Sequence, residues 1–132
     1  METIKVACAV ILKDGKLLVA QRSQKMNFPL KWEFPGVKIN VGESAEDCLH
    51  RELQEELNIS VTIESNFDET FYSDAEFKIS LIPFVVRYKD GEIMLAEHRE
   101  SRWVGKNEMR ELDWAPADLP IVKRLLNSNY IK

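Results

Sequence analysis

The chain has 132 residues, of which 45% are hydrophobic and 30% charged, with a net charge of −4 and a pI near 5.3. These values fit one domain over residues 1–132 and give no basic surface for polymeric nucleic acid. No apolar run approaches the ~20 residues of a membrane span, and we expect no secretory signal. The two cysteines lack motif spacing, which favours a reducing, cytoplasmic setting.

The first forty or so residues predict a β-hairpin and then a short extended segment. Two apolar runs lie on either side of Asp14-Gly15, and Asp-Gly between such runs is a strong hairpin signal. The stretch KWEFPG, residues 31–36, is predicted to be extended and to end at Pro35-Gly36.

An amphipathic helix is predicted next. Ser44 is a good N-cap, and Asp47 lies at the third helical position, as in a capping box. The helix should run to about Leu57, because Asn58 adopts the left-handed conformation that terminates helices more readily than most residues.

The second half predicts more strands before it returns to helix. Residues 60–72 and 77–89 are typical of two long strands of a meander, and Pro83 argues for an edge position or a bulge in the second. A short strand is expected around Trp103, followed by a short helix at residues 106–112.

The chain closes with a predicted helix in residues 116–129, in which Asp118 is a candidate N-cap and Ile121, Val122 and Leu125 form an apolar stripe. Helices and strands mix without regular alternation along the chain. The fold class is therefore predicted as α+β, with helices layered on a mixed sheet.

The predicted helix at residues 45–57 breaks two local rules. Its apolar face forms core contacts through Leu49, Leu53 and Leu57. The adjacent face carries three carboxylates spaced i, i+3, i+4: Glu52, Glu55 and Glu56. Like charges at this spacing cost roughly 0.2–0.5 kcal/mol per pair, and carboxylates near a helix C-terminus oppose the dipole by about 0.3–1 kcal/mol each. From spacing alone, a solvated acidic face and a site for a hard cation such as Mg²⁺ are both open.

Residues 36–59 resemble the Nudix box, the signature of the Nudix hydrolase family, whose usual form is G-x5-E-x7-R-E-U-x-E-E-x-G-U with U aliphatic. Glu43 corresponds to the first glutamate, and RELQEELNI, Arg51 to Ile59, matches the second half at every defined position but one. This match favours the cation site over the solvated acidic face.

Two box glycines are replaced, by Val37 and Asn58. Asn58 is a mild change, because asparagine tolerates positive φ. Val37 is the more serious one, because a β-branched residue would be strained if that position required φ > 0.

The resemblance implies a set of roles for the box residues. Mg²⁺ or Mn²⁺ would be bound by the carboxylates of Glu52, Glu55 and Glu56 and by the Gly36 carbonyl. Glu43 and Arg51 would pair and fix the loop against the helix.

Glu97, outside the box, would complete the metal site or act as the base; the alternative is an ordinary loop glutamate. His98 beside it is expected to be exposed or hydrogen-bonded rather than a ligand. The sequence does not identify which glutamate is the general base.

The similarity extends to AQRS, KWEFPG, EHRESRWV and WAPADLPIVKRLL, which resemble the MutT-like branch of the family, with its 8-oxo-dGTP diphosphatases and CTP pyrophosphohydrolases. This implies an α/β/α sandwich around a mixed sheet. It also implies metal-dependent hydrolysis of a (d)NTP to a (d)NMP and pyrophosphate, in the service of nucleotide-pool sanitation and so of DNA repair, with (d)CTP or oxidised dGTP as substrate.

Four residues are candidates for binding the substrate or its base. Asp118 could accept hydrogen bonds from cytosine or guanine, or serve only as an N-cap. Arg22 would contact substrate, or form a surface salt bridge. Phe34 and Trp32 could stack on a base, but core packing is at least as good an account of one of them.

Two competing hypotheses accompany this prediction. One keeps the chemistry but changes the substrate to ADP-ribose, a dinucleoside polyphosphate or a sugar nucleotide. The other is a catalytically silent domain that binds a nucleotide. In each case the expected partner is a small-molecule nucleotide, with no membrane or polymeric nucleic acid, and the protein is expected to be a monomer or homodimer.

Overall fold

The chain opens with the predicted hairpin. Strands β1 (Ile4–Lys13) and β2 (Lys16–Gln21) pair antiparallel. The turn residues Asp14 and Gly15 have φ of 52° and 77°, the left-handed conformation that two-residue hairpin turns require.

The computed structural model describes residues 2–132. The other strands are β3 (Trp32–Glu33), β4 (Gly36–Lys38), β5 (Ser60–Asn66), β6 (Thr70–Ser73), β7 (Lys78–Asp90) and β8 (Glu100–Val104). The helices are α1 (Ala45–Leu57), α2 (Lys106–Glu111) and α3 (Leu119–Leu126), with a 3-10 turn, η1 (Pro116–Asp118), before the last.

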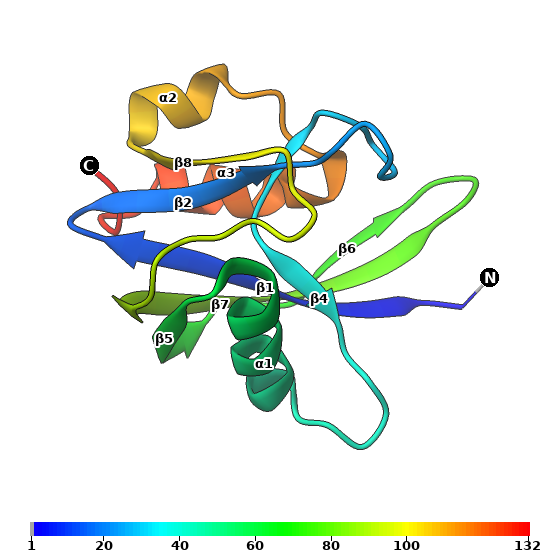
Figure 1. Cartoon of the computed structure of the whole chain (residues 1–132). Coiled ribbons are helices and arrows are strands. Elements are labelled where there is room, and N and C mark those ends of the chain that lie inside the picture. Colours follow the sequence, from blue (N-terminus) through cyan, green and yellow to red (C-terminus); the bar gives the residue numbers. More distant parts are fainter. Residues whose placement is uncertain (1) are drawn as a thin grey trace.

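The strands form a mixed sheet with helices on both faces (Figure 1). Its main order is β3-β2-β1-β7-β5, while β4 pairs with β1, β6 with β7 and β8 with β2. The β1–β7 pair is parallel and the other pairs are antiparallel. Helix α1 covers one face, and α2 and α3 cover the other. The α/β/α sandwich and the α+β class are therefore confirmed.

Strand β1 is buried on both faces. Cys8, Val10 and Leu12 pack into the core beneath α2 and α3. The alternate residues, Ala7, Ala9 and Ile11, pack into the core beneath α1. This explains why β1 is almost continuously apolar instead of alternating with polar residues. Cys8 and Cys48 are both free and buried.

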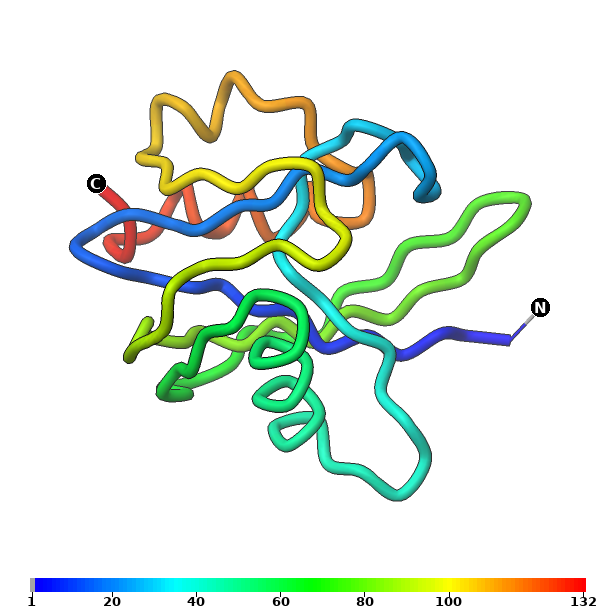
Figure 2. Tube along the Cα trace, viewed as in Figure 1, coloured from blue at the N-terminus to red at the C-terminus, as the bar shows by residue number. Residues whose placement is uncertain are grey.

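The two strands of the hairpin separate beyond the Ile11–Leu18 pair. There β3 pairs with the end of β2, and β4 pairs with the first half of β1. Between them, the amide of Ala9 donates to the carbonyl of Pro35 at 2.8 Å. The segment 32–38 thus runs between the separated strands, as the tube in Figure 2 shows.

In the middle of the sheet, the single strand predicted over residues 60–72 is wrong, and of the two alternatives for Pro83 the edge position is wrong. Residues 60–72 form two strands, β5 and β6, rather than one, and both pair with β7. Strand β7 is therefore interior, so Pro83 is not at an edge. Pro83 lies opposite the junction of β5 and β6, where its carbonyl accepts from the amide of Phe67 at 2.9 Å. No partner residue stands opposite it on that side, so its missing N–H interrupts no ladder.

Helix α1 has the predicted ends. The Ser44 side chain accepts from the Asp47 amide at 3.1 Å, and Asn58 is left-handed with φ of 60°. Its buried face consists of Cys48, Leu49, Leu53 and Leu57, as the leucine spacing predicted.

The strand at Trp103 and the two C-terminal helices also lie where predicted. Asp118 occupies the N-cap position of α3, but its side chain makes no capping hydrogen bond. Within residues 2–132, no helix has the length and apolar character to cross a membrane.

Candidate functional site

Arg51 organises the charged face of α1. Its guanidinium donates to both carboxylate oxygens of Glu43, at 3.1 and 3.0 Å. A further nitrogen contacts Glu52 at 2.8 Å and Glu55 at 3.2 Å. The Arg51 guanidinium lowers the pKa of Glu43. The pair of Glu43 and Arg51 therefore joins the loop before α1 to the helix.

Glu56 has the most perturbed carboxyl group on this helix face. It is half-buried, and burial raises its pKa from 4.5 to about 6, with smaller contributions from the negative charges of Glu52 and Glu97. His98 acts in the opposite direction. The ionised carboxylates of Glu56 and its neighbours therefore destabilise one another.

The loop between β7 and β8 binds to the end of α1. The amides of Met94 and Ala96 donate to the carbonyls of Leu57 and Glu56 at 3.0 and 3.1 Å. Carbonyls in the last turn of a helix have no partner within it, so these bonds both complete α1 and fix the loop. Glu97, the residue after Ala96, is thereby brought to the helix carboxylates.

Gly36 and Val37 lie in β4 with ordinary extended backbones. Val37 is not among the residues with positive φ; it pairs with Ala7, and its half-buried side chain packs against the core beneath α1. Val37 therefore has no backbone strain from a positive φ. At Gly36 space is tight, because a Cβ there would lie 3.3 Å from both the Ala7 carbonyl oxygen and Val6.

The side chains of these carboxylates do not form a preformed metal-binding site. Within residues 2–132, no three His, Cys, Asp or Glu side chains are arranged to hold a metal ion, and Glu52 and Glu55 both bind Arg51. The donors nevertheless fit Mg²⁺ or Mn²⁺, which prefer carboxylate and carbonyl oxygens. The raised pKa of Glu56 points the same way, because a cation would relieve the repulsion that causes part of it.

One cavity of about 320 Å³ joins these residues to the predicted base-binding residues. Its wall contains Gly36 and two groups of neighbouring residues: Glu97 with Glu56, which we call the acidic end, and Arg22 and Phe34 with Asp118, which we call the base end. Glu43, Arg51, Glu52 and Glu55 are not part of this wall.

Asp118 is almost completely buried, with 5% of its surface exposed. Burial raises its pKa well above the ordinary value, and the charge of Glu33 adds to the increase. A hydrogen bond from the backbone of Phe34 and the charge of Arg22 partly offset it. The side chain thus lines the cavity instead of capping α3.

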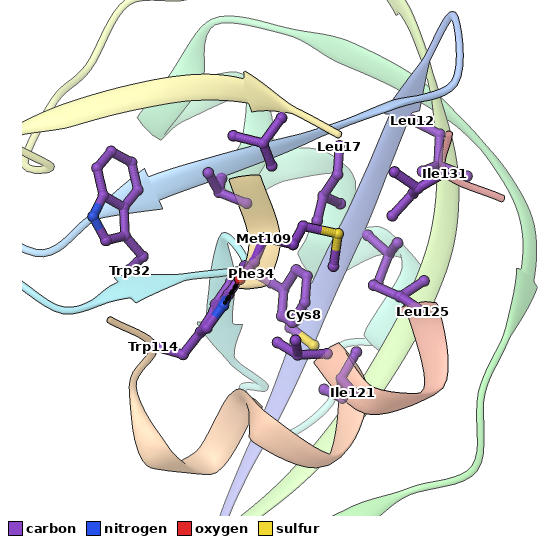
Figure 3. Close-up of a cluster of buried hydrophobic side chains, with 14 of the residues drawn as sticks. Cys8, Leu12, Leu17, Trp32, Phe34, Met109, Trp114, Ile121, Leu125 and Ile131 are labelled. Atoms are coloured by element: carbon purple, nitrogen blue, oxygen red, sulfur yellow. Dashed lines mark hydrogen bonds between the residues drawn. The ribbon is translucent and has the colours of Figure 1, made fainter. Parts of the chain in front are cut away.

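The two candidate aromatic residues have different surroundings. Phe34 is part of the cavity wall, but its side chain is buried in the core, where the ring stacks on Trp114 with centroids 5.2 Å apart (Figure 3). Trp32 packs in the core, with the Arg102 guanidinium 4.9 Å from its ring centre, and is not part of the cavity wall. Of these two residues, only Phe34 is therefore part of the cavity wall.

Sequence reasoning missed Glu33 as a site residue. One Glu33 oxygen accepts from Arg22 at 2.6 Å, and the other lies 2.8 Å from His98 Nε2. His98 is thus hydrogen-bonded, as expected. A charged residue between the buried Trp32 and Phe34 is the only local signal for Glu33, since its partner His98 is 65 residues away.

Known proteins resemble the chain over nearly its whole length. A family model described as the NUDIX domain matches residues 1–125. The CTP pyrophosphohydrolase of Escherichia coli (strain K12) is 32% identical over 126 residues, which cover 96% of this chain and 93% of that protein. An 8-oxo-dGTP diphosphatase of Haemophilus influenzae is 33% identical over 129 residues, covering 96% and 94%. The crystal structure of a MutT protein from Methanosarcina mazei Go1 matches with a TM-score of 0.85 and 25% identity, covering 96% and 95%. The chain belongs to the Nudix family.

Proposed function

We propose that the protein is a divalent-metal-dependent nucleoside triphosphate pyrophosphohydrolase, which converts a (d)NTP and water to a (d)NMP and pyrophosphate. The observation that carries this proposal is the single cavity with acidic oxygen donors at one end and Arg22, Phe34 and Asp118 at the other. Two relatives are named for CTP and 8-oxo-dGTP, which supports (d)CTP or oxidised dGTP as substrate. In this proposal residues 1–132 form one domain that acts on free cytoplasmic nucleotides, as a monomer or homodimer.

The acidic end of the cavity would bind the phosphates through Mg²⁺ or Mn²⁺. The residues proposed to hold the cation are Glu52, Glu55, Glu56, Glu97 and the Gly36 carbonyl. When bound, the cation supplies neutralisation of phosphate charge and an acidified water for attack on phosphorus. Arg51 holds Glu52 and Glu55 on the same side of α1 and is itself held by Glu43.

A proton acceptor is also needed at this end. Glu56 is one candidate for this role, because its carboxyl group lines this end of the cavity. Glu97 is the second candidate, since it lines the same end of the cavity.

The other end of the cavity would select the base. The Asp118 carboxyl oxygens can accept from the exocyclic amine of cytosine or from guanine N1 and N2. Phe34 would hold Asp118 in place, because its backbone hydrogen-bonds to that carboxyl group while its ring is fixed in the core by stacking on Trp114. Arg22 adds donors beside Asp118 at the same end.

The replaced box glycines do not favour the silent-domain alternative. Val37 is unstrained in β4, and Asn58 adopts the left-handed conformation that a glycine would provide. These two replacements were the sequence features in favour of a catalytically silent domain.

A nucleotide panel tests the proposal. The protein is incubated with Mg²⁺ and CTP, dCTP, dGTP, 8-oxo-dGTP or ADP-ribose, and the products are separated by ion-exchange chromatography. We expect monophosphate and pyrophosphate from CTP, dCTP or 8-oxo-dGTP. Turnover of ADP-ribose alone would mean that the enzyme acts on another class of substrate. The absence of turnover on every nucleotide would overturn the proposal.

A further inference from the structure

We propose that Glu33 is a positioning residue that couples the two ends of the cavity, by holding Arg22 with one carboxylate oxygen and His98 with the other. The inference rests on the proposed function, because it concerns how the base-binding and phosphate-binding ends act together. None of the roles that the Nudix box implies falls on Glu33 or His98.

The contacts of Glu33 are short and shielded from water. Arg22 Nη1 lies 2.6 Å from one oxygen and His98 Nε2 lies 2.8 Å from the other. The side chains of Arg22, Glu33 and His98 are only 19%, 15% and 5% exposed. Because buried charges are retained only when paired, both partners of Glu33 matter for its placement. All three residues line the cavity.

His98 is the side-chain anchor of the loop that carries Glu97. Just before Glu97 and His98, the Ala96 amide donates to the Glu56 carbonyl at 3.1 Å. Just after them, the Arg99 amide donates to the Gln21 carbonyl at 3.0 Å. Glu97 and His98 lie between these bonds, and the His98 ring ties them to β3 through Glu33. Loss of that contact therefore leaves Glu97 and His98 held only by the two backbone bonds that flank them.

Arg22 depends on Glu33 in the same way. Its Nε donates to the Asn27 carbonyl, and its Nη1 donates to Glu33. Without Glu33, the guanidinium keeps only the contact with the loop after β2. Glu33, on β3, therefore positions Arg22 at the base end of the cavity and Glu97 at the acidic end.

A structural ion pair would behave differently from a positioning residue. Glu64 and Arg87 provide the comparison, because they form a contact of 2.7 Å at 40% and 44% exposure, away from the cavity. Removing such an exposed pair changes stability slightly and does not separate kcat from KM.

Steady-state kinetics with the preferred nucleotide test the coupling in wild type, Glu33→Ala, His98→Ala, His98→Gln, the Glu33→Ala/His98→Ala double variant and the control Glu64→Ala. We expect His98→Ala to lower kcat about tenfold at nearly constant KM, because Glu97 is misplaced. Glu33→Ala should lower kcat equally and also raise KM, because Arg22 is freed. The double variant should have the kcat of Glu33→Ala.

His98→Gln tests whether the hydrogen bond to Glu33, rather than the size of the His98 side chain, holds the loop. The Gln Nε2 reaches the same region as the His Nε2 and can donate to Glu33, so kcat should stay within about twofold of wild type. Glu64→Ala should match wild type in both constants. Multiplicative losses in the double variant, or equal losses in His98→Gln and His98→Ala, would overturn the coupling.

Hydrogen exchange provides a readout without metal or nucleotide. Peptides spanning residues 94–100 should exchange faster in Glu33→Ala and His98→Ala than in wild type, and those in Glu64→Ala should not. Unchanged exchange in both cavity variants would contradict the proposal. If wild type turns over no nucleotide, the proposed function fails, and exchange then decides alone whether Glu33 holds the loop.

Discussion

The amide of Ala96 donates to the carbonyl oxygen of Glu56 at 3.1 Å. This bond joins the loop after β7 to the last turn of α1. It brings Glu97 near enough for its charge to raise the pKa of the Glu56 carboxyl. The acidic end of the cavity is therefore assembled from two segments that are distant in the chain.

Replacing Glu56 by Gln should stabilise the metal-free protein at neutral pH. The pKa of Glu56 rises from 4.5 in its ordinary state to about 6 in the folded protein. The folded state therefore binds more protons than the unfolded state between these values, and wild type loses stability as the pH rises through them. Because Glu56 is only half-buried, solvent screening limits the loss to about 1 kcal/mol.

Urea unfolding of wild type and Glu56→Gln in EDTA measures this difference. At about pH 4.5 the two proteins should be nearly equal, and at about pH 7.5 the variant should be more stable by that amount. A variant that is less stable than wild type at the higher pH would contradict the assignment of the raised pKa.

With Mg²⁺ present at neutral pH, wild type should become more stable than Glu56→Gln. A cation that binds only the folded protein stabilises it by about 2.7 kcal/mol at a hundred times its Kd. The melting temperature of wild type should therefore rise with Mg²⁺ at neutral pH, and that of Glu56→Gln should rise much less. Glu64→Gln, which alters an exposed glutamate away from the cavity, should respond as wild type does. Equal shifts in all three proteins would place the cation elsewhere.

Asp118→Asn should change which nucleotide is preferred. The carboxyl is buried in the cavity and makes no capping bond, so the substitution exchanges an acceptor for a donor at the base end. We expect the ratio of kcat/KM for CTP to that for 8-oxo-dGTP to change by at least about tenfold.

Stability provides the control for this variant. Because burial already raises the pKa of Asp118, the neutral amide should leave the free energy of unfolding at neutral pH unchanged or higher. Asp113→Asn, at a carboxylate that is 73% exposed, should leave the ratio of nucleotides unchanged. An unaltered ratio in Asp118→Asn would remove Asp118 from base recognition.

Val37→Gly should weaken the fold, although it restores the usual box residue. The substitution removes a half-buried side chain that packs beneath α1 and introduces glycine into a strand. Together these effects should lower the free energy of unfolding by about 1–2 kcal/mol. Val41→Gly makes the same change at a fully exposed loop position and should cost less than about 0.5 kcal/mol. A Val37→Gly protein more stable than wild type would mean that Val37 is strained after all.

Local sequence signals predicted the elements whose ends are set by nearby residues. Asp14-Gly15 placed the hairpin, Ser44 and Asn58 placed both ends of α1, and the carboxylate spacing indicated the charged face. These features depend on turn and capping chemistry within a few residues, which a single sequence contains.

Features that depend on pairing between distant segments were not predicted. The break between β5 and β6 and the interior position of Pro83 follow from how β7 is paired on both sides. Val37 could not be judged from the sequence, because its φ depends on pairing with Ala7. Glu33 and His98 meet only because segment 32–38 enters the opening between β1 and β2.

The most direct measurement is pyrophosphate release from CTP, dCTP and 8-oxo-dGTP by wild type, Glu55→Gln and the control Glu64→Gln, with Mg²⁺ and with EDTA. The account predicts turnover by wild type and Glu64→Gln that requires Mg²⁺, and a loss of at least about 100-fold in Glu55→Gln. Turnover that persists in EDTA, or the absence of turnover on every nucleotide by a folded wild-type protein, would contradict it.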